Sequence, residues 1–187
     1  IATLKLSHRV IIPFKSYKKF IPKEFHKKVI SIPNGVDCSI FNNSNDFFLN
    51  KVNPAKPVVM YIGAIDEWFD IDLVEETSKQ LPNYQIIIVG PSSQAMIKRL
   101  KSKRNNILYF PTISHGKIPQ YLSIANVCII PFVKNDLTSC ILPNKIFEYS
   151  AAGKKTVLTN FNPDLEEFKD YIEIAQNRQE FIEKIIK

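Results

Sequence analysis

The fold is decided by the stretch VVMYIG at residues 58–63, an unbroken apolar run that ends on a glycine. Strands of this composition are typical of parallel sheets, because both of their faces are covered by helices. A second run of the same kind is YQIIIVG at residues 84–90. Between the two runs, apolar residues recur at helical spacing over 71–81. The pattern therefore predicts a β-α-β unit, the building block of a parallel α/β sheet.

The same alternation extends through most of the chain. Further strand-like runs are expected at 9–14, 28–33, 107–111, 127–132, 156–159 and 171–175. Helix-like segments are expected at 94–103, 117–125, 144–152, 165–169 and 179–187. The sequence thus predicts a doubly wound, mostly parallel sheet in a Rossmann-like, three-layer α/β/α arrangement with right-handed crossovers.

The positive charge of the chain is concentrated near its start. Residues 1–56 hold ten Lys and Arg against three acidic residues, whereas 57–187 hold fifteen of each. Residues 42–57 are rich in Asn and Pro, which is typical of a linker. We therefore expect residues 1–41 to be the tail of a truncated N-terminal domain with an interdomain strand. Residues 58–187 are expected to form the ligand-binding domain.

Composition narrows the range of partners. Three widely spaced cysteines match neither a disulfide framework nor a metal cluster, which favours a reducing, cytoplasmic location. No glycine-aromatic or zinc pattern accompanies the basic residues, which argues against nucleic acid as a partner. Lysines and aromatic residues are interleaved over 14–28, which leaves two interpretations open. In the first, the segment is a patch that binds an acidic partner or the anionic inner face of a membrane. In the second, it is only a solvated, lysine-rich face.

A short helix between Pro143 and Gly153 is the strongest candidate for chemistry. Proline suits the first helical position, and glycine suits the left-handed residue after the last turn. Asn144, Lys145 and Glu148 then share one face. The helix N-terminus and the lysine could hold a diphosphate, while the glutamate accepts hydrogen bonds from a sugar diol. The alternative is an ordinary surface Lys–Glu pair on an amphipathic helix.

Several short motifs accompany this helix in a fixed order. They are IPNGVD at 32–37, YIGA at 61–64, IVGP at 88–91, IPQYL at 118–122 and LPNKIFEYSAAGK at 142–154. Together, over residues 28–187, the set resembles the C-terminal, donor-binding half of retaining, metal-independent GT-B glycosyltransferases of the group 1 type. Within that group, the set is most similar to the bacterial enzymes that build surface polysaccharides.

The resemblance implies a role for particular residues. Glu148 corresponds to the second glutamate of the family's Glu-x7-Glu motif, which holds the nucleotide ribose, and Lys145 to a basic residue near the diphosphate. Gly63 and Ala64 correspond to the turn that lets the backbone approach the donor. The other donor-binding positions implied are Phe110 and Pro111 near the base, and Ser139, Cys140, Leu142 and Asn144 near the sugar and phosphates.

The family's reaction moves a glycosyl group from a nucleoside-diphosphate sugar to an acceptor hydroxyl, with UDP as the expected nucleotide and no metal. This half would stabilise the leaving diphosphate through Lys145. The acceptor site would lie in a missing N-terminal domain, so this piece alone is expected to bind nucleotide without catalysing. Two positions depart from the family pattern. The first glutamate of the motif falls at Cys140, and residues 65–70 are acidic where many relatives carry Arg and Lys.

These departures keep two other functions open. One is a Rossmann-like module that has lost donor chemistry and serves in assembly or membrane attachment. The other is a sugar-nucleotide epimerase, which would need its own acid or base, and His115 is the candidate for that group. The acidic residues at 66–72 do not match a calcium-binding loop, because no glycine lies at its centre.

Overall fold

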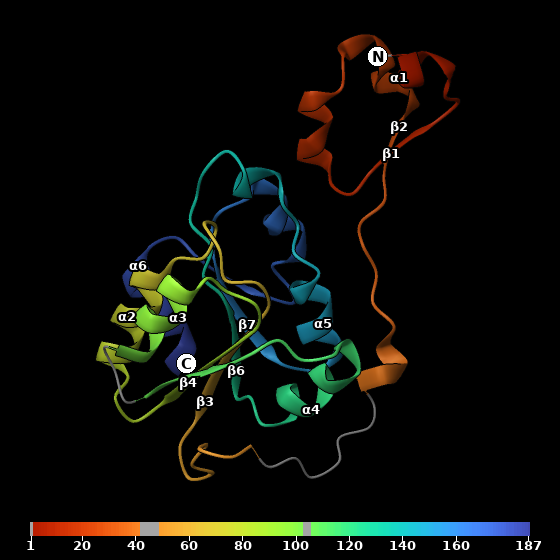
Figure 1. Cartoon of the computed structure of the whole chain (residues 1–187). Coiled ribbons are helices and arrows are strands. Elements are labelled where there is room, and N and C mark those ends of the chain that lie inside the picture. The colour runs from red at the N-terminus through yellow and green to blue at the C-terminus, as the bar shows by residue number, and fades with distance from the viewer. Residues whose placement is uncertain (1, 42–48, 103–105) are drawn as a thin grey trace.

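The computed structural model describes residues 2–41, 49–102 and 106–187. Its centre is a six-stranded sheet in the order β5-β4-β3-β6-β7-β8 (Figure 1). The strands are β3 (Val58–Ile62), β4 (Gln85–Val89), β5 (Ile107–Phe110), β6 (Val127–Ile130), β7 (Lys155–Thr159) and β8 (Glu173–Ala175). Every pairing between them is parallel. The predicted doubly wound sheet is therefore confirmed.

Helices cover both faces of this sheet. They are α2 (Ile71–Gln80), α3 (Gln94–Ser102), α4 (Ile118–Ser123), α5 (Lys145–Ala151) and α6 (Arg178–Ile186). Figure 1 shows α2, α3 and α6 on one side of the sheet and α4 and α5 on the other, which confirms the three layers. The predicted end of α3 at residue 103 lies outside the described residues.

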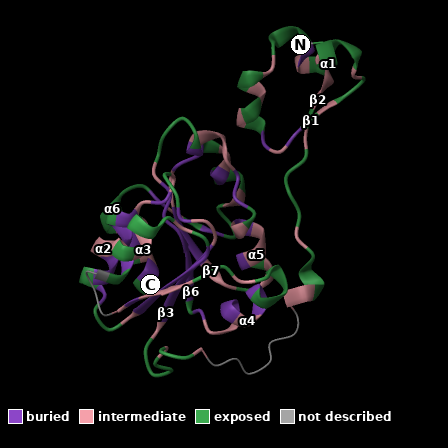
Figure 2. Ribbon diagram, in the orientation of Figure 1, coloured by how far each residue is buried: buried purple, intermediate pink, exposed green. Residues whose placement is uncertain are grey.

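The core lies along the central strands. Every residue of β3, β4 and β6 is buried (Figure 2). Gln85 is the polar exception on β4, and its side chain is fully used, because it accepts from the backbone N–H of Asn53 at 2.7 Å and donates to the Asn53 carbonyl at 2.8 Å. Residues 49–57 of the predicted linker therefore contact the start of β4, while residues 42–48 lie outside the described part of the chain. The domain boundaries stay a prediction.

The first part of the chain forms a smaller unit. It contains α1 (Ala2–Leu6), β1 (Val10–Ile12), the 3-10 helices η1 (Lys15–Phe20) and η2 (Lys23–Lys28), β2 (Val29–Ser31) and η3 (Cys38–Phe41). The strands β1 and β2 form a parallel pair. Ile12, Phe14 and Phe25 are its buried apolar residues. The two strand-like runs predicted here are thus shorter than expected, because the chain turns into 3-10 helices between them.

The smaller unit contacts the larger one through η1 and η6 (Pro163–Phe168). The backbone N–H of Ser16 donates to Asp164 Oδ2 at 2.8 Å, and Lys15 pairs with Glu167 at 2.9 Å. The helix-like segment expected at 165–169 is a 3-10 helix, η6, which begins two residues earlier and ends at Phe168. Asn162 precedes Pro163 and caps η6 by accepting from the Asp164 N–H at 2.8 Å.

Candidate functional site

The sheet opens between β3 and β6 at the carboxyl ends of these strands. The two strands pair at only two positions each, although they are neighbours. The chain runs from β3 to β4 on one side of β3 and later returns to β6 on the other side. Open α/β sheets bind ligands at this kind of reversal in strand order. The opening is therefore where a ligand site is expected.

Tyr149 of α5 holds the helix against this opening. Its side chain is fully buried, and its hydroxyl accepts from the backbone N–H of Ile62, the last residue of β3, at 2.9 Å. A strand N–H that β6 does not reach is satisfied in this way. The contact fixes α5 beside the end of β3.

A cavity of about 290 Å³ lies at the ends of β3 and β4 beside α5. Its walls come from two strand ends, from the loop after β5 and from the start of α5. The lining residues are Ile62, Gly63, Val89, Gly90, Pro91, Thr112, Ile113, Ile118, Asn144, Lys145 and Glu148. Four of the predicted donor-binding residues are thus brought together: Gly63, Asn144, Lys145 and Glu148.

Lys145 reaches this cavity because Gly63 has no side chain. A Cβ atom at Gly63 would overlap Cε and Nζ of Lys145. The ammonium lies 5.4 Å from the centre of the Tyr61 ring. Burial lowers the pKa of Lys145, and the charge of Glu148 offsets part of that effect. Within the described part of the chain, no hydrogen bond or salt bridge involves this ammonium. A largely buried cation that forms no salt bridge is suited to binding an anion.

Glu148 supplies the carboxylate of the cavity wall. Its side chain is 15% exposed, and its Oε1 lies 3.2 Å from Nε2 of His115, whose side chain is 64% exposed. The histidine comes from η4 (His115–Lys117), at the end of the loop that follows β5. The sequence offered His115 as the acid or base of the epimerase alternative. The contact between His115 and Glu148 depends on the path of that loop, which no pattern in the sequence predicts.

Asn144 is the N-cap of α5, and it links the helix to the first part of the chain. Its Oδ1 accepts from Nδ2 of Asn34 at 2.7 Å, whereas its side chain makes no capping bond. The helix begins at Lys145, so the prediction of Pro143 as the first helical residue is wrong. Pro143 precedes the cap, where its carbonyl accepts from the Ile146 N–H at 3.2 Å.

The predicted stop of this helix at Gly153 is confirmed. Gly153 has a φ of 64°, in the left-handed region. Its N–H donates to the Ser150 carbonyl at 2.9 Å, and the Lys154 N–H donates to the Tyr149 carbonyl at 2.9 Å. These two bonds form a Schellman motif, which satisfies carbonyls that the helix end would leave open.

Two glycines at the ends of neighbouring strands make the cavity floor. Gly90 has a φ of 143°, and a Cβ atom there would overlap the carbonyl oxygen of Gly63. The N–H of Gly63 donates to the Val89 carbonyl at 2.8 Å. Gly90 was absent from the predicted site residues. Its signal was the sequence itself, a glycine and a proline directly after a buried strand.

The other predicted residues lie outside this cavity. The Phe110 ring packs edge-on against Tyr121 with centroids 6.3 Å apart, and Phe110 and Pro111 line a separate cavity along β5. The carbonyl of Ala64 accepts from the Tyr61 hydroxyl at 2.7 Å. Their donor-binding roles stay predictions.

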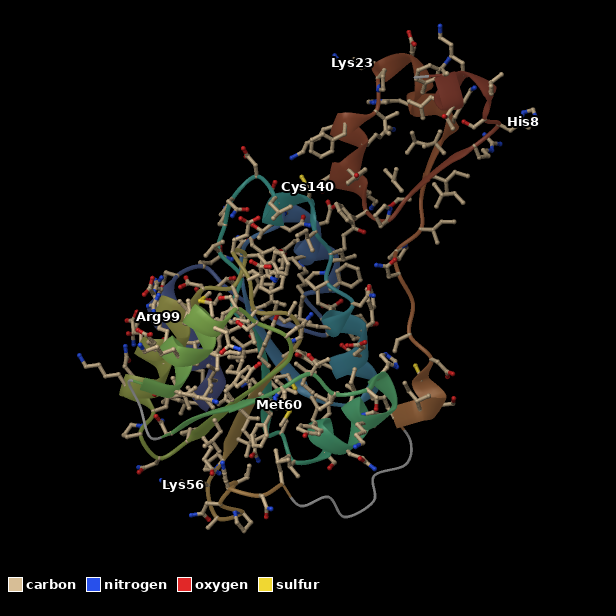
Figure 3. The ribbon with its side chains drawn as sticks, viewed as in Figure 1. His8, Lys23, Lys56, Met60, Arg99 and Cys140 are labelled. Carbon is tan, nitrogen blue, oxygen red and sulfur yellow. The ribbon has the colours of Figure 1, made fainter. Side chains whose placement is uncertain are left out.

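The loop before α5 likewise stands apart from Lys145. Ser139 donates from its hydroxyl to the Asp136 carbonyl at 2.8 Å, and its Oγ is 3.4 Å from Sγ of Cys140. Both residues belong to η5 (Thr138–Cys140), where Figure 3 labels Cys140. Leu142 is buried in the core. None of the three lines the cavity described above.

The acidic stretch after Gly63 has structural partners. Asp70 caps α2 by accepting from the Leu73 N–H at 2.9 Å, and Arg178 of α6 pairs with Asp70 at 2.8 Å. Over residues 2–41, 49–102 and 106–187, no three His, Cys, Asp or Glu side chains gather as metal ligands would. In the same residues, no helix combines the length and apolarity needed to cross a membrane.

Comparison with known families identifies the class. A sequence profile of the family described as Glycosyl transferases group 1 matches residues 56–187. The chain belongs to this family of glycosyltransferase domains. It is also 24% identical over 157 residues to a protein of Bacillus subtilis (strain 168) named as a teichuronic acid biosynthesis glycosyltransferase, TuaH. That match covers 78% of this chain and 38% of the relative.

Solved structures share the fold. Sucrose-phosphate synthase from Thermosynechococcus elongatus superposes with a TM-score of 0.74 at 17% identity, over 99% of this chain and 50% of that one. Anabaena HepE in complex with UDP gives 0.71 at 15% identity, over 98% and 54%. TarM of S. aureus, in a complex that includes UDP, gives 0.70 at 15% identity, over 98% and 37%. The chain therefore spans about half the length of these proteins or less, and it shares their GT-B, Rossmann-like fold.

Proposed function

We propose that this chain is the donor-binding part of a glycosyltransferase and that a nucleoside diphosphate binds in the cavity around Lys145. The observation that supports the proposal is the largely buried ammonium of Lys145, which forms no salt bridge with any described residue and is only partly compensated by the charge of Glu148. A diphosphate supplies the missing negative charge. Family membership and the UDP found in two of the solved structures of similar fold favour UDP as the nucleotide.

Each wall of the cavity has a task in this proposal. Lys145 neutralises the diphosphate, and the side-chain-free backbone at Gly63 and Gly90 allows phosphate oxygens to approach closely. Glu148 accepts hydrogen bonds from the ribose hydroxyls. During transfer the bond between the sugar and the diphosphate breaks, and negative charge grows on the departing phosphate. A fixed cation stabilises that charge more in the transition state than in the ground state.

The proposed reaction is transfer of a glycosyl group from a UDP-sugar to an acceptor hydroxyl, with retention at the anomeric carbon, in the synthesis of a cell-surface polysaccharide. The named role of the Bacillus subtilis relative in teichuronic acid biosynthesis supports the polysaccharide. We assign the acceptor site and the remaining catalytic residues to a further domain, because the similar proteins are about twice as long as this chain or longer.

Titration calorimetry with UDP tests the proposal. We expect UDP to bind the wild type and UMP to bind more weakly, because UMP lacks the second phosphate. Lys145→Ala should weaken UDP binding by at least about tenfold, since a charge-assisted contact contributes about 1.5–3 kcal/mol. Glu148→Gln should also weaken it. Glu166→Gln, an exposed acidic residue on η6, is the matched control and should bind as the wild type does. Absence of heat with every nucleoside diphosphate would overturn the proposal.

We further propose that residues 14–28 attach the protein to an anionic membrane surface. Two lysines of this segment have structural partners: Lys15 pairs with Glu167, and Lys28 donates to the carbonyl at Ser7 at 2.8 Å. Four others have no ion pair within the described part of the chain: Lys18, Lys19, Lys23 and Lys27. Phe20, which lies among them, is 56% exposed. Lysines without ion pairs around an exposed aromatic residue match an interfacial patch, and the ammonium of Lys19 lies 5.0 Å from the centre of the Phe20 ring.

A further inference from the structure

His115 and Glu148 form a pair at the mouth of the cavity. Nε2 of His115 lies 3.2 Å from Oε1 of Glu148. The two residues are 33 positions apart and come from different elements, η4 and α5. The glutamate is mostly buried in the cavity wall, whereas the histidine lies outside it in solvent. The imidazole therefore holds the carboxylate from its solvent side.

The pair leaves half of the carboxylate available. An ionised carboxylate accepts hydrogen bonds only, so the proton of the contact must sit on Nε2 of His115. The second oxygen, Oε2, accepts no hydrogen bond from the described residues. Of the described residues that line the cavity, Glu148 alone carries a carboxylate. A vicinal diol that enters the cavity thus meets one carboxylate, with its orientation already fixed through the other oxygen.

We propose that His115 is a positioning residue for ribose recognition, because it holds the Glu148 carboxylate in the orientation that accepts the sugar hydroxyls. The inference rests on the proposed nucleotide site. A free glutamate side chain loses rotamer freedom when it binds a ligand, and that loss weakens binding by about 0.5–1.5 kcal/mol. A histidine that orders the side chain beforehand removes most of this loss. Its effect then depends on the hydroxyls rather than on the phosphates.

The loop that carries His115 supports this assignment. Thr112 and Ile113 of the same loop line the cavity, and η4 leads directly into α4, whose first residue Ile118 also lines it. The Lys117 N–H donates to the Ser114 carbonyl at 2.9 Å, which fixes the turn that bears the histidine. The position of the imidazole is thus coupled to the cavity wall on both sides of η4.

The test compares two nucleotides by calorimetry: UDP and 2′,3′-dideoxy-UDP, which keeps the diphosphate and lacks both ribose hydroxyls. We expect His115→Ala to weaken UDP binding about 2- to 10-fold and to leave dideoxy-UDP binding unchanged. His115→Gln should restore UDP binding, because its amide N–H₂ group can take the place of Nε2. Ser114→Ala, in the same turn, is the matched control and should change neither nucleotide's affinity.

The outcomes separate this inference from the proposed function. If the wild type binds UDP and His115→Ala binds it equally well, the positioning role is wrong and the nucleotide site stands. If His115→Ala weakens both nucleotides to the same extent, the histidine contacts the phosphates or supports the fold, and the positioning role is again wrong. If the wild type binds neither nucleotide, both proposals are overturned.

Discussion

Lys145 carries a positive charge that the fold largely encloses and that the charge of Glu148 offsets only in part. Its aliphatic stem passes over Gly63, and its ammonium faces the ring of Tyr61. Desolvation disfavours the charged form, which is why the pKa of Lys145 lies below its usual value of 10.5. Between this lowered pKa and 10.5, the unfolded chain binds more protons than the folded chain. The stability contributed by Lys145 therefore rises with pH across that window.

Replacing this charge is expected to stabilise the protein while removing its binding activity. Lys145→Met keeps the stem and eliminates the desolvated ammonium, so thermal unfolding at neutral pH should shift upward by about 2–4 °C, the change that 1 kcal/mol produces in a chain of this size. The rise of stability with pH should shrink at the same time. Calorimetry should show loss of UDP binding.

Lys154→Met is the matched control. Its ammonium donates to the carbonyls of Ser123 and Ala125 at 3.2 and 3.0 Å, so its removal breaks satisfied contacts and should destabilise the fold. A Lys145→Met variant that melts below the wild type would contradict the account of an unsatisfied charge.

At the scale of elements, the ends of β3 and β4 show why two similar glycines differ. A Cβ atom at Gly63 would meet the flexible end of Lys145, whereas one at Gly90 would meet the backbone of Gly63. A lysine side chain can move aside, but a strand backbone within a sheet cannot. A side chain at Gly63 is therefore expected to disturb mainly the position of Lys145 in the candidate site, whereas a side chain at Gly90 is expected mainly to lower the stability of the fold.

This difference can be measured with one pair of variants. Gly63→Ala should lower stability by about 1–3 kcal/mol, the typical cost of a side chain at an unfavourable φ, and should weaken UDP binding because Lys145 is displaced. Gly90→Ala should cost more than about 4 kcal/mol, in the range of severe core disruptions. Denaturant unfolding followed by circular dichroism gives both values. Equal unfolding free energies for the two variants would contradict this reading of the strand ends.

The elements that could be predicted from sequence are those with strong local patterns. The strands β3, β4 and β6 are continuous apolar runs, and α5 ends at a glycine that must adopt a positive φ. The segment 15–28 gave no such signal, and it forms two six-residue 3-10 helices that Pro22 separates. Their positions depend on contacts with other elements: Lys28 of η2 donates to the carbonyls of Leu4 and Lys5 in α1, and η1 contacts η6, which lies far away in the sequence.

The residues of the candidate site also fall into those that the sequence predicts and those that it does not. Gly63, Lys145 and Glu148 could be predicted because each lies at a recognisable strand end or on one helix face. The approach of Gly90 to Gly63 and of His115 to Glu148 depends on how neighbouring strands and a loop are spaced in three dimensions. No local pattern encodes that spacing.

At the scale of the whole molecule, only part of the basic segment 14–28 is used in the contact between the smaller and the larger unit. Lys15 and Ser16 bond to η6, whereas the next lysines along the segment have no partner of opposite charge among the described residues. The contact between the two units therefore pairs Lys15 with an acidic residue and leaves the later lysines of the segment for the proposed membrane surface. About 1 kcal/mol of attraction is expected for each lysine near an anionic surface.

Vesicle sedimentation tests this division of lysines. The protein should sediment with phosphatidylcholine vesicles that contain phosphatidylglycerol and not with phosphatidylcholine alone, and added salt should weaken the association. A variant with Gln at Lys18, Lys19, Lys23 and Lys27 should lose it. A control variant with Gln at four exposed lysines of the larger unit should retain it: Lys51, Lys56, Lys79 and Lys98. If both variants lost vesicle binding to the same extent, the binding would depend only on net charge, and the proposal of a defined patch would be wrong.

The cavity around Lys145 is assembled from segments that span residues 62 to 148, so it exists only when most of the sheet has formed. A ligand that fits it binds the complete fold and no partly folded intermediate. By mass action, a ligand at one hundred times its dissociation constant would add about 2.7 kcal/mol to the free energy of unfolding. The supply of nucleotide in a cell would then also govern how much of this protein survives proteolysis.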